Sequence, residues 1–311
     1  MFKLLSLSIF LCIFATQNAS ALTLKKGETL GSDGKINPST ASKSVEANDI
    51  EKNHPIGICA KENSRKFKLT KDVGFGNTYK KSLWEDYKPY GVCIVDKDDD
   101  HPTRLGQQSL RFELRDGDCG YNKGGWSDCD NDRQRHELAS QPFKSNVNYW
   151  FTWSIHLSED YQVIYPAKNA LGQFHQNDGF PLFMFQNYNG GYHLDRQFNY
   201  RTINHIKLLE QKDMLGQWND VIVNARWTHK DDGFFKLWVN GKLVHVFEGQ
   251  TQSEGDTVYQ KFGIYHSYLS RAKVSTIPSQ VVYYDEVRTA RSCKKLKLNE
   301  LGYDCDELIE E

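Results

Sequence analysis

The sequence has very few methionines and no excess of either charge. Only three of its 311 residues are Met, whereas 17 are Phe, 16 are Tyr and seven are Trp, a balance that favours β-strands over helical bundles. The formal net charge of −1 excludes the overall positive field of many nucleic-acid-binding proteins, so we expect no nucleic acid as partner. A chain of this length can bury a large core, and the composition predicts one large β-rich domain, or at most two.

Long apolar runs are also missing after the first 21 residues, which argues against a transmembrane helix and against a membrane as partner. Residues 1–21 themselves combine Lys3, the apolar run "LLSLSIFLCIFA" and the small residues "ASA", which is the pattern of a secretory signal peptide. We therefore expect a mature chain that begins near Leu22 and is secreted or periplasmic.

No two cysteines are spaced as Cys-x-x-Cys, so a structural zinc site is not expected. Cys12 belongs to the predicted signal peptide, and the remaining six form an even set in an exported chain, which predicts disulfides. Fifteen pairings of six cysteines are possible. Closeness in sequence favours Cys119 with Cys129 and Cys293 with Cys305, which leaves Cys59 for Cys93.

Composition and pattern divide the rest of the chain into three stretches. Residues 22–52 are rich in Lys, Ser, Gly and Asn without any period, and they predict a linker or a loosely held arm. Residues 53–292 form a series of short alternating segments broken by Gly, Asn and Asp. Residues 293–311 are expected to be a C-terminal tail tied by a disulfide.

Many short strands over this length predict an all-β fold, a β-sandwich of the jelly-roll type. Asn240-Gly241 stands between two strand-like runs and predicts a β-hairpin. Residues 203–215, "INHIKLLEQKDML", have the clearest helical period of the series, so we expect a helix there. The Gly- and Asp-rich stretch 116–132 predicts a surface loop, tied by a disulfide and lying beside a cleft.

Three of the predicted strands carry polar groups at every second residue, which places these groups on one face of each strand. In "LGQFHQ", Gln173 and His175 share a face while Phe174 points the opposite way. The other two strands are 133–140, "RQRHELAS", and 259–268, "YQKFGIYHSY". Their polar faces carry Arg133, Arg135 and Glu137, and Tyr259, Lys261, Gly263 and Tyr265, respectively.

This set of side chains suits β-elimination on a uronic-acid polysaccharide. The proton to be removed lies beside a carboxylate and is barely acidic, so donors such as Arg and Gln must first neutralise that carboxylate. A His or a Tyr phenolate can then act as the base, and a Tyr can protonate the departing glycosidic oxygen. We expect a nearby cation such as Lys261 to lower the pKa of Tyr265 and to attract an anionic chain.

The segments "RHEL", "QFH" and "YQKFGIY" resemble the three signature strands of the jelly-roll polysaccharide lyases, a group that includes alginate lyases. The sequence is more similar to the branch of heparin lyase I and glucuronan lyase, in which "LGQFH", "WND", "LWVNG", "KFGIY" and "YDEVR" recur in this order. The resemblance covers about residues 105–292. It implies a concanavalin A-like sandwich with a concave cleft, and a lyase acting on an anionic polysaccharide.

The same resemblance implies roles for individual residues. His175 would be the base that takes the C5 proton, and Tyr265 would be the acid that protonates the leaving oxygen, with a second role as base left open. Gln173 and Arg135 would neutralise the substrate carboxylate, with help from Lys261. The remaining candidate substrate contacts are Arg133, Glu137, Tyr259 and Trp126.

Several of these residues also have a purely structural interpretation. Arg135 and Glu137 alone are typical of a cross-strand ion pair on a sheet. Trp218 and Trp227 are further candidate platforms for sugar stacking, although buried packing is the default for Trp. The proposed reaction requires no cofactor, and Asp285 is a weak candidate ligand for a structural calcium ion of the kind that some relatives hold. We expect a monomer.

Two other functions compete with a lyase. A non-catalytic, lectin-like sandwich shares the fold but has no need of Gln173, His175 and Tyr265 together. A jelly-roll glycoside hydrolase needs two carboxylates at a fixed separation, and "ELRDGD" at 113–118 lacks the third acid of the usual strand signature. The absence of a long Lys and Arg run favours a carboxylate-only polyuronate over sulfated heparin. The choice among glucuronan, alginate, heparin or heparan and other polyuronates stays open, as does endo or exo action.

Overall fold

The computed structural model describes residues 29–30, 36–37, 56–61, 63–85 and 88–310. The chain forms two compact units, Met1–Asn53 and His54–Glu311. In the first unit, β1 (Thr29–Leu30) pairs with β2 (Ile36–Asn37) in antiparallel fashion. The predicted signal peptide, residues 1–21, lies outside the described residues, and of the predicted arm, residues 22–52, only these two strands are described.

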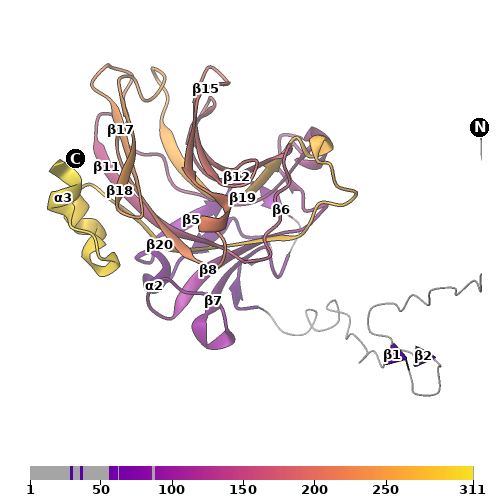
Figure 1. Cartoon of the computed structure of the whole chain (residues 1–311). Helices are drawn as coiled ribbons and strands as arrows, with labels where there is room; N and C mark the ends of the chain where they lie inside the picture. The colour runs from indigo at the N-terminus through magenta and orange to yellow at the C-terminus, as the bar shows by residue number, and fades with distance from the viewer. Residues whose placement is uncertain (1–28, 31–35, 38–55, 62, 86–87, 311) are drawn as a thin grey trace, which may run out of the picture. The chain divides into compact units, whose positions relative to one another are not determined.

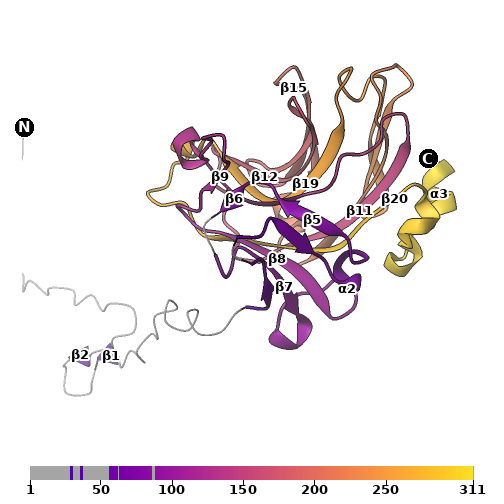
Figure 2. The same cartoon turned by 180° about the vertical axis from the view of Figure 1, so that it is seen from behind.

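Two eight-stranded sheets make up the second unit (Figures 1 and 2). Sheet I has the strand order β15-β14-β13-β12-β19-β10-β5-β4, and sheet II has the order β18-β17-β16-β11-β20-β8-β7-β3. All of the described pairings between their strands are antiparallel. The predicted all-β, jelly-roll sandwich is therefore confirmed.

The strands of sheet I are β4 (Lys66–Lys68), β5 (Thr78–Lys81), β10 (Arg133–Ala139), β12 (Lys168–Gln176), β13 (Pro181–Asn187), β14 (Tyr192–Phe198), β15 (Arg201–Leu209) and β19 (Val258–Ser267). Those of sheet II are β3 (Ile58–Cys59), β7 (Val92–Asp96), β8 (Gln108–Leu114), β11 (Asn148–Leu157), β16 (Trp218–Arg226), β17 (Phe234–Val239), β18 (Lys242–Glu248) and β20 (Gln280–Ala290). A small extra ladder joins β6 (Trp84–Glu85) and β9 (Gly120–Tyr121).

Short helices connect these strands or follow them. They are α2 (Lys71–Gly74), η1 (Lys97–Asp99), η2 (Cys129–Asn131), η3 (Gln211–Asp213), η4 (Leu269–Arg271), η5 (Cys293–Leu296), η6 (Leu298–Leu301) and α3 (Cys305–Glu310). Among the described residues, no helix is long and apolar enough to cross a membrane.

The inner faces of the two sheets pack against each other through large aromatic side chains. Phe174 on β12 is fully buried, and its ring centroid lies 4.9 Å from that of Phe151 and 5.0 Å from that of Trp227. The prediction that Phe174 points into the core is confirmed. Trp227 is itself fully buried, so the idea that it stacks on a sugar is wrong. Trp218 belongs to β16 of sheet II and packs against His156, away from the polar strands of sheet I.

The predicted helix at 203–215 is wrong. Residues Arg201–Leu209 form the edge strand β15, which pairs with β14, and only a short 3-10 turn follows. Ile206 and Leu208 are two residues apart and both pack against the core, while Lys207 between them is exposed. This alternation, which the apparent helical period had masked, is that of a strand with one buried face.

The predicted hairpin at Asn240-Gly241 is confirmed, because these two residues join β17 to β18. Both have positive φ, 50° and 77°, as the two central residues of a type I′ turn require. Glycine tolerates such angles freely and asparagine more readily than most residues. The Asn-Gly pair in the sequence therefore reflects the positive φ angles that this turn requires.

The three predicted disulfides are confirmed as Cys59–Cys93, Cys119–Cys129 and Cys293–Cys305. The Cα atoms of the second and third pairs are 5.4 Å and 5.7 Å apart, within the usual range. The third pair joins η5 to α3, and their apolar residues pack with Trp150 and Trp238 of sheet II. The C-terminal segment thus covers part of the outer face of sheet II, beside β17 and β18 (Figures 1 and 2).

Candidate active site

The three polar strands predicted from the sequence are neighbours in the middle of sheet I, in the order β12-β19-β10. Because Phe174 occupies the inner face, Gln173 and His175 project from the outer face of the sheet. The side chains of Arg135, Glu137 and Lys261 meet them there, as the contacts below show. The predicted common face is therefore present, whereas the concavity of that face stays a prediction.

The strand register fixes which side chains are neighbours on this face. Tyr265 lies opposite Arg135 on β10, Lys261 lies opposite Gln173 on β12, and Tyr259 lies opposite His175. The His175 and Tyr259 rings are 5.5 Å apart between centroids. The cross-strand neighbour of His175 is thus Tyr259 rather than Tyr265. The Arg135 guanidinium links the two positions, because it lies 4.0 Å from the Tyr265 ring centroid and is among the charges that lower the pKa of His175.

A β-bulge causes this register. Ala170 pairs with Tyr265, but Gly172 pairs with Phe262, so β19 has one extra residue in this interval. Gly263 lies in the interval with a φ of 134°, and an added Cβ would collide with the carbonyl oxygen of His136 on β10. A glycine is therefore required between Lys261 and Tyr265.

Arg135 is held by two carboxylates. Its Nε and Nη2 atoms donate to the two oxygens of Asp128 at 2.7 and 2.8 Å, and its Nη1 donates to Glu137 at 3.3 Å. Burial by itself lowers the pKa of Arg135, but the Glu137 and Asp128 carboxylates outweigh burial and raise that pKa above its ordinary value. A guanidinium has five N–H donors, so these three contacts leave two for another acceptor.

Gln173 and Arg135 converge, as predicted, but on an internal carboxylate. The Gln173 amide donates to Glu137 at 2.6 Å, and the Glu137 side chain is only 1% exposed. Glu137 therefore joins β12 to β10 across β19 and fixes the orientation of both donors. Arg135 and Glu137 do form an ion pair, as the sequence suggested, but both belong to β10, so the pair is not a cross-strand one.

Lys261 is a buried cation that forms no ion pair with the described residues. Its side chain is next to the Tyr259 ring, with Nζ 5.5 Å from the centroid, and the residue is 8% exposed. Within the described part of the chain its ammonium makes no hydrogen bond or ion pair. Burial lowers the pKa of Lys261 to about 8, against the opposing effect of the Glu137 carboxylate. A site of this kind favours an anionic ligand.

His175 has the protonation state of a base. Its Nδ1 contacts the carbonyl oxygen of Gln176, and because a carbonyl only accepts, Nδ1 carries the proton and Nε2 keeps a lone pair. Burial and the nearby Lys261 ammonium lower the pKa of His175 to about 3. The imidazole is therefore neutral at any pH from weakly acidic to alkaline.

Tyr265 has the protonation state of an acid. Its hydroxyl accepts a hydrogen bond from the Nε of Arg133 at 2.8 Å, and the Arg135 guanidinium lies 4.0 Å from its ring centroid. We expected a neighbouring cation to lower the pKa of Tyr265, but burial has the larger effect and raises it. Burial also raises the pKa of Tyr259, to about 12. Both phenols are protonated at neutral pH.

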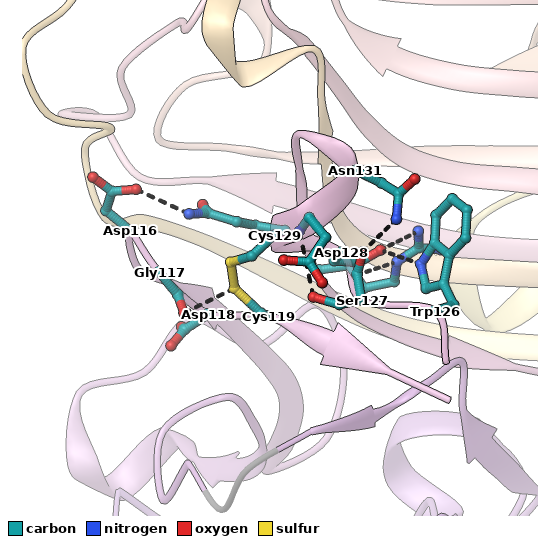
Figure 3. Close-up of a disulfide and its surroundings, with 12 residues drawn as sticks. Asp116, Gly117, Asp118, Cys119, Trp126, Ser127, Asp128, Cys129 and Asn131 are labelled. Carbon is teal, nitrogen blue, oxygen red and sulfur yellow. Dashed lines mark hydrogen bonds and ion pairs between the residues drawn. A yellow bond between two sulfur atoms is a disulfide. The ribbon is translucent and has the colours of Figure 1, made fainter. Parts of the chain in front are cut away.

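The disulfide-tied loop supplies Asp128, the most deeply buried member of the site, and Figure 3 shows Asp128 in the loop with Cys129 and Trp126. Asp128 immediately precedes Cys129, is 0% exposed, and accepts a hydrogen bond from the indole of Trp126 at 3.0 Å in addition to those from Arg135. Trp126 is 36% exposed, and the Arg133 guanidinium lies 5.6 Å from its ring centroid. Sequence reasoning singled out Trp126 but missed Asp128, whose only signal was its place in a loop rich in acids.

The candidate calcium ligand Asp285 does not present its oxygens to an ion. One oxygen accepts hydrogen bonds from the backbone of Arg104 and Leu105, and the other from that of Glu286. Burial raises its pKa to about 8. These contacts do not fit a Ca²⁺ ligand, which offers free oxygens. Over the described ranges of the chain, no group of three or more His, Cys, Asp and Glu side chains could hold a metal ion.

A polysaccharide lyase family model matches residues 92–288, whereas no curated protein matches the chain. Among solved structures, the endo-β-1,4-glucuronan lyase of the fungus Trichoderma reesei is 17% identical, with 76% of this chain and 94% of that chain covered and a TM-score of 0.48. The alginate lyase AlgAT5 of polysaccharide lyase family 7 is 14% identical, with 73% and 93% covered and a TM-score of 0.45. At these identities and scores, neither likeness determines a substrate.

Proposed function

Because the chain belongs to the polysaccharide lyase family, we propose that it cleaves a uronic-acid-containing polysaccharide by β-elimination at the outer face of sheet I. The observation that carries this proposal is Lys261, a buried ammonium with no ionic partner in the described chain, beside His175, Gln173 and Arg135. A buried charge requires a partner of the opposite sign. The carboxylate of a uronate is such a partner, and it brings an acidifiable C5 proton with it.

The first step of the proposed reaction is neutralisation of the carboxylate. Lys261 supplies a positive charge, and Arg135 and Gln173 supply the N–H donors that Asp128 and Glu137 leave unused. Since Asp128 and Glu137 hold these donors in place before substrate arrives, little reorganisation is needed when charge develops on the substrate carboxylate. Preorganised donors of this kind stabilise a transition state more than they stabilise the ground state.

The second step is elimination. His175 takes the C5 proton at Nε2, the electrons of the C5–H bond form a C4–C5 double bond, and the bond from C4 to the glycosidic oxygen breaks. The leaving oxygen receives the phenolic proton of Tyr265. Tyr259 is the ring that touches His175, and its phenol is also protonated, so it is the alternative acid. Arg133 and Trp126 are proposed to contact neighbouring sugars.

The finer features are proposals of the same kind. We place the substrate among glucuronan, alginate and related carboxylate-only polyuronates, and the resemblance to heparin lyase I remains a sequence-based prediction. The three disulfides support secretion, because disulfides persist in oxidising compartments. We propose a monomer that needs no cofactor for the reaction itself.

A substrate panel tests the function. The purified protein is incubated with glucuronan, alginate, heparin and heparan sulfate, while ultraviolet absorbance of the unsaturated product and reducing ends are both measured. A lyase produces both signals together. A hydrolase produces reducing ends without the absorbance, and a lectin-like protein binds the polymer and produces neither. Either of these last two results on all substrates would reject the proposal.

A further inference from the structure

A second cluster of ring side chains lies on the same sheet, beyond β13. The rings of His193 on β14 and His205 on β15 are stacked, with centroids 4.6 Å apart and an interplanar angle of 12°. Tyr188, directly after β13, contacts both imidazoles at 6.0 and 5.0 Å. Tyr165 packs edge-on against Tyr188 at 5.0 Å. We call these four residues the tyrosine–histidine platform.

The platform faces the same way as the candidate active site. Tyr192 and Leu194 on β14 belong to the core between the sheets, so His193, which lies between them, projects from the outer face. The register gives a transverse row from Tyr265 through Ala170 and Gln186 to His193. Three spacings between strands amount to about 14 Å, so a sugar chain that crosses the sheet through Tyr265 arrives at the platform.

The platform has exposed rings above a rigid support. Tyr165 is 41% exposed, and the His205 side chain is 40% exposed. Below them, His193 is 5% exposed, and its Nδ1 atom has no hydrogen-bond partner in the described chain. Asp195 accepts a hydrogen bond from the His205 ring and another from the Gln186 amide at 2.5 Å. The first of these bonds fixes the orientation of the His205 imidazole. Rigid rings of this kind cost little entropy when they bind a ligand.

A lysine that is unpaired within the described residues lies on β12, one strand away from Tyr188. Lys168, the first residue of β12, lies opposite Ser267, two residues beyond Tyr265 on β19. It is half-buried, and within residues 56–61, 63–85 and 88–310 its ammonium makes no hydrogen bond or ion pair. The next residue, Asn169, pairs with Asn187 on β13, which directly precedes Tyr188. Aromatic rings and a cation on neighbouring strands match the chemistry of a uronate unit, which has apolar ring faces and one carboxylate.

We propose that Lys168 and the tyrosine–histidine platform form a distal subsite that binds a further uronate unit of the polymer being cleaved. A sugar ring stacks on Tyr165, Tyr188 or His205, and its carboxylate pairs with Lys168. This inference rests on the proposed function. Since the subsite is remote from the scissile bond, it contributes to binding of long chains and not to the chemical step.

Kinetics on substrates of two lengths test the subsite. For Tyr188→Ala and Lys168→Ala, we expect the KM on the polymer to rise about three- to tenfold, with kcat and the KM on the shortest cleaved oligosaccharide unchanged. Tyr188→Phe keeps the ring and should behave as wild type. Lys242→Ala, on the edge strand of sheet II, is the charge control. Equal losses on both substrates, or no loss on the polymer, would overturn the subsite.

Calorimetric binding separates this inference from the proposed function. Wild type is expected to bind the polymer about three- to tenfold more tightly than Tyr188→Ala or Lys168→Ala. This difference in affinity does not depend on whether the protein cleaves the polymer. If wild type binds a polyuronate but cleaves none, the lyase activity is rejected. If the two variants then bind more weakly than wild type, the subsite is still supported. Equal affinities of wild type and both variants would reject the subsite alone. Absence of binding to every polyuronate would reject both.

Discussion

Asp128 accepts two hydrogen bonds from the Arg135 guanidinium, and both side chains are buried. The two residues are seven positions apart, and η2 turns the chain between them so that the loop folds back over β10. In the proposed reaction, Asp128 therefore acts on substrate only through Arg135, as a positioning residue. The disulfide-tied loop then supports the site through this contact.

The Asp128→Asn variant should lose activity without losing its fold. Arg135 would keep one anionic partner, Glu137, and would lose its bidentate anchor, and a displacement of a catalytic group by about 1 Å costs about a hundredfold in rate. The Asp128 carboxylate also raises the pKa of Lys261. We therefore expect the alkaline limb of the kcat/KM profile to move to lower pH, which looser packing alone would not cause. Asp130→Asn, an exposed acid of the same loop, is the control and should match wild type.

Removal of two different disulfides should separate activity from stability. Cys119–Cys129 and Cys293–Cys305 close loops of similar length, with sequence separations of 10 and 12, so each contributes a comparable loop-closure term, about 3 kcal/mol or less. Double Ser variants of either pair should lower the free energy of unfolding similarly. Only the first pair should lower kcat, because it adjoins Asp128, whereas the second packs on sheet II. Equal kcat values for the two variants would contradict the assignment of the loop.

Lys261→Arg should change the pH dependence of the reaction. The pKa of Lys261 is about 8, so its ammonium is charged below that pH and neutral above it, and carboxylate neutralisation is lost as pH rises. We expect the kcat/KM of wild type to fall above about pH 8, since this parameter reports groups of the free enzyme. Arginine stays charged over this pH range, so the kcat/KM of the variant should not fall above pH 8, even if its maximum is lower than that of wild type. Lys242→Arg, on sheet II, is the control and should not change the pH at which kcat/KM falls.

The acid and base assignments are tested by three substitutions. His175→Ala and Tyr265→Phe should each lower turnover by about 10²–10⁴-fold, the usual contribution of a positioned acid or base. Tyr259→Phe should have a small effect if Tyr265 is the acid. A large loss of turnover in Tyr259→Phe, together with a small loss in Tyr265→Phe, would show that Tyr259 and not Tyr265 is the acid. His229→Ala, at a half-buried position next to β16, controls for removal of an imidazole, and near-ultraviolet circular dichroism checks the fold.

Strand alternation was sufficient to predict the faces of the site but not its register. The period of two places Gln173 and His175 together whatever their partners are. Which tyrosine lies beside His175 depends on the bulge near Gly263, and a single inserted residue changes every pairing beyond it without changing the pattern of polar and apolar residues in the strand. The sequence therefore pointed to the correct sheet face and left the neighbours of His175 unresolved.

The errors in the sequence analysis come from tertiary contacts. Trp227 is buried because Phe174 and Phe235 surround it, and both partners come from other strands, β12 and β17. Residues 203–209 have an apolar spacing that suits a helix, but β14 offers them a partner strand. The pairing of Asp128 with Arg135 depends on how a loop folds, which residue type and spacing alone do not determine.

The glycine at 263 limits how this protein can be redesigned. Saturation mutagenesis of the side chains around the reacting sugar would normally include every position on β19 between Lys261 and Tyr265. At this one, any side chain would collide with the His136 carbonyl and would also have to adopt a φ of 134°. Libraries that vary it should yield mainly unfolded protein, so new selectivity has to be introduced at other positions, such as Lys168 on β12 and Trp126 in the disulfide-tied loop.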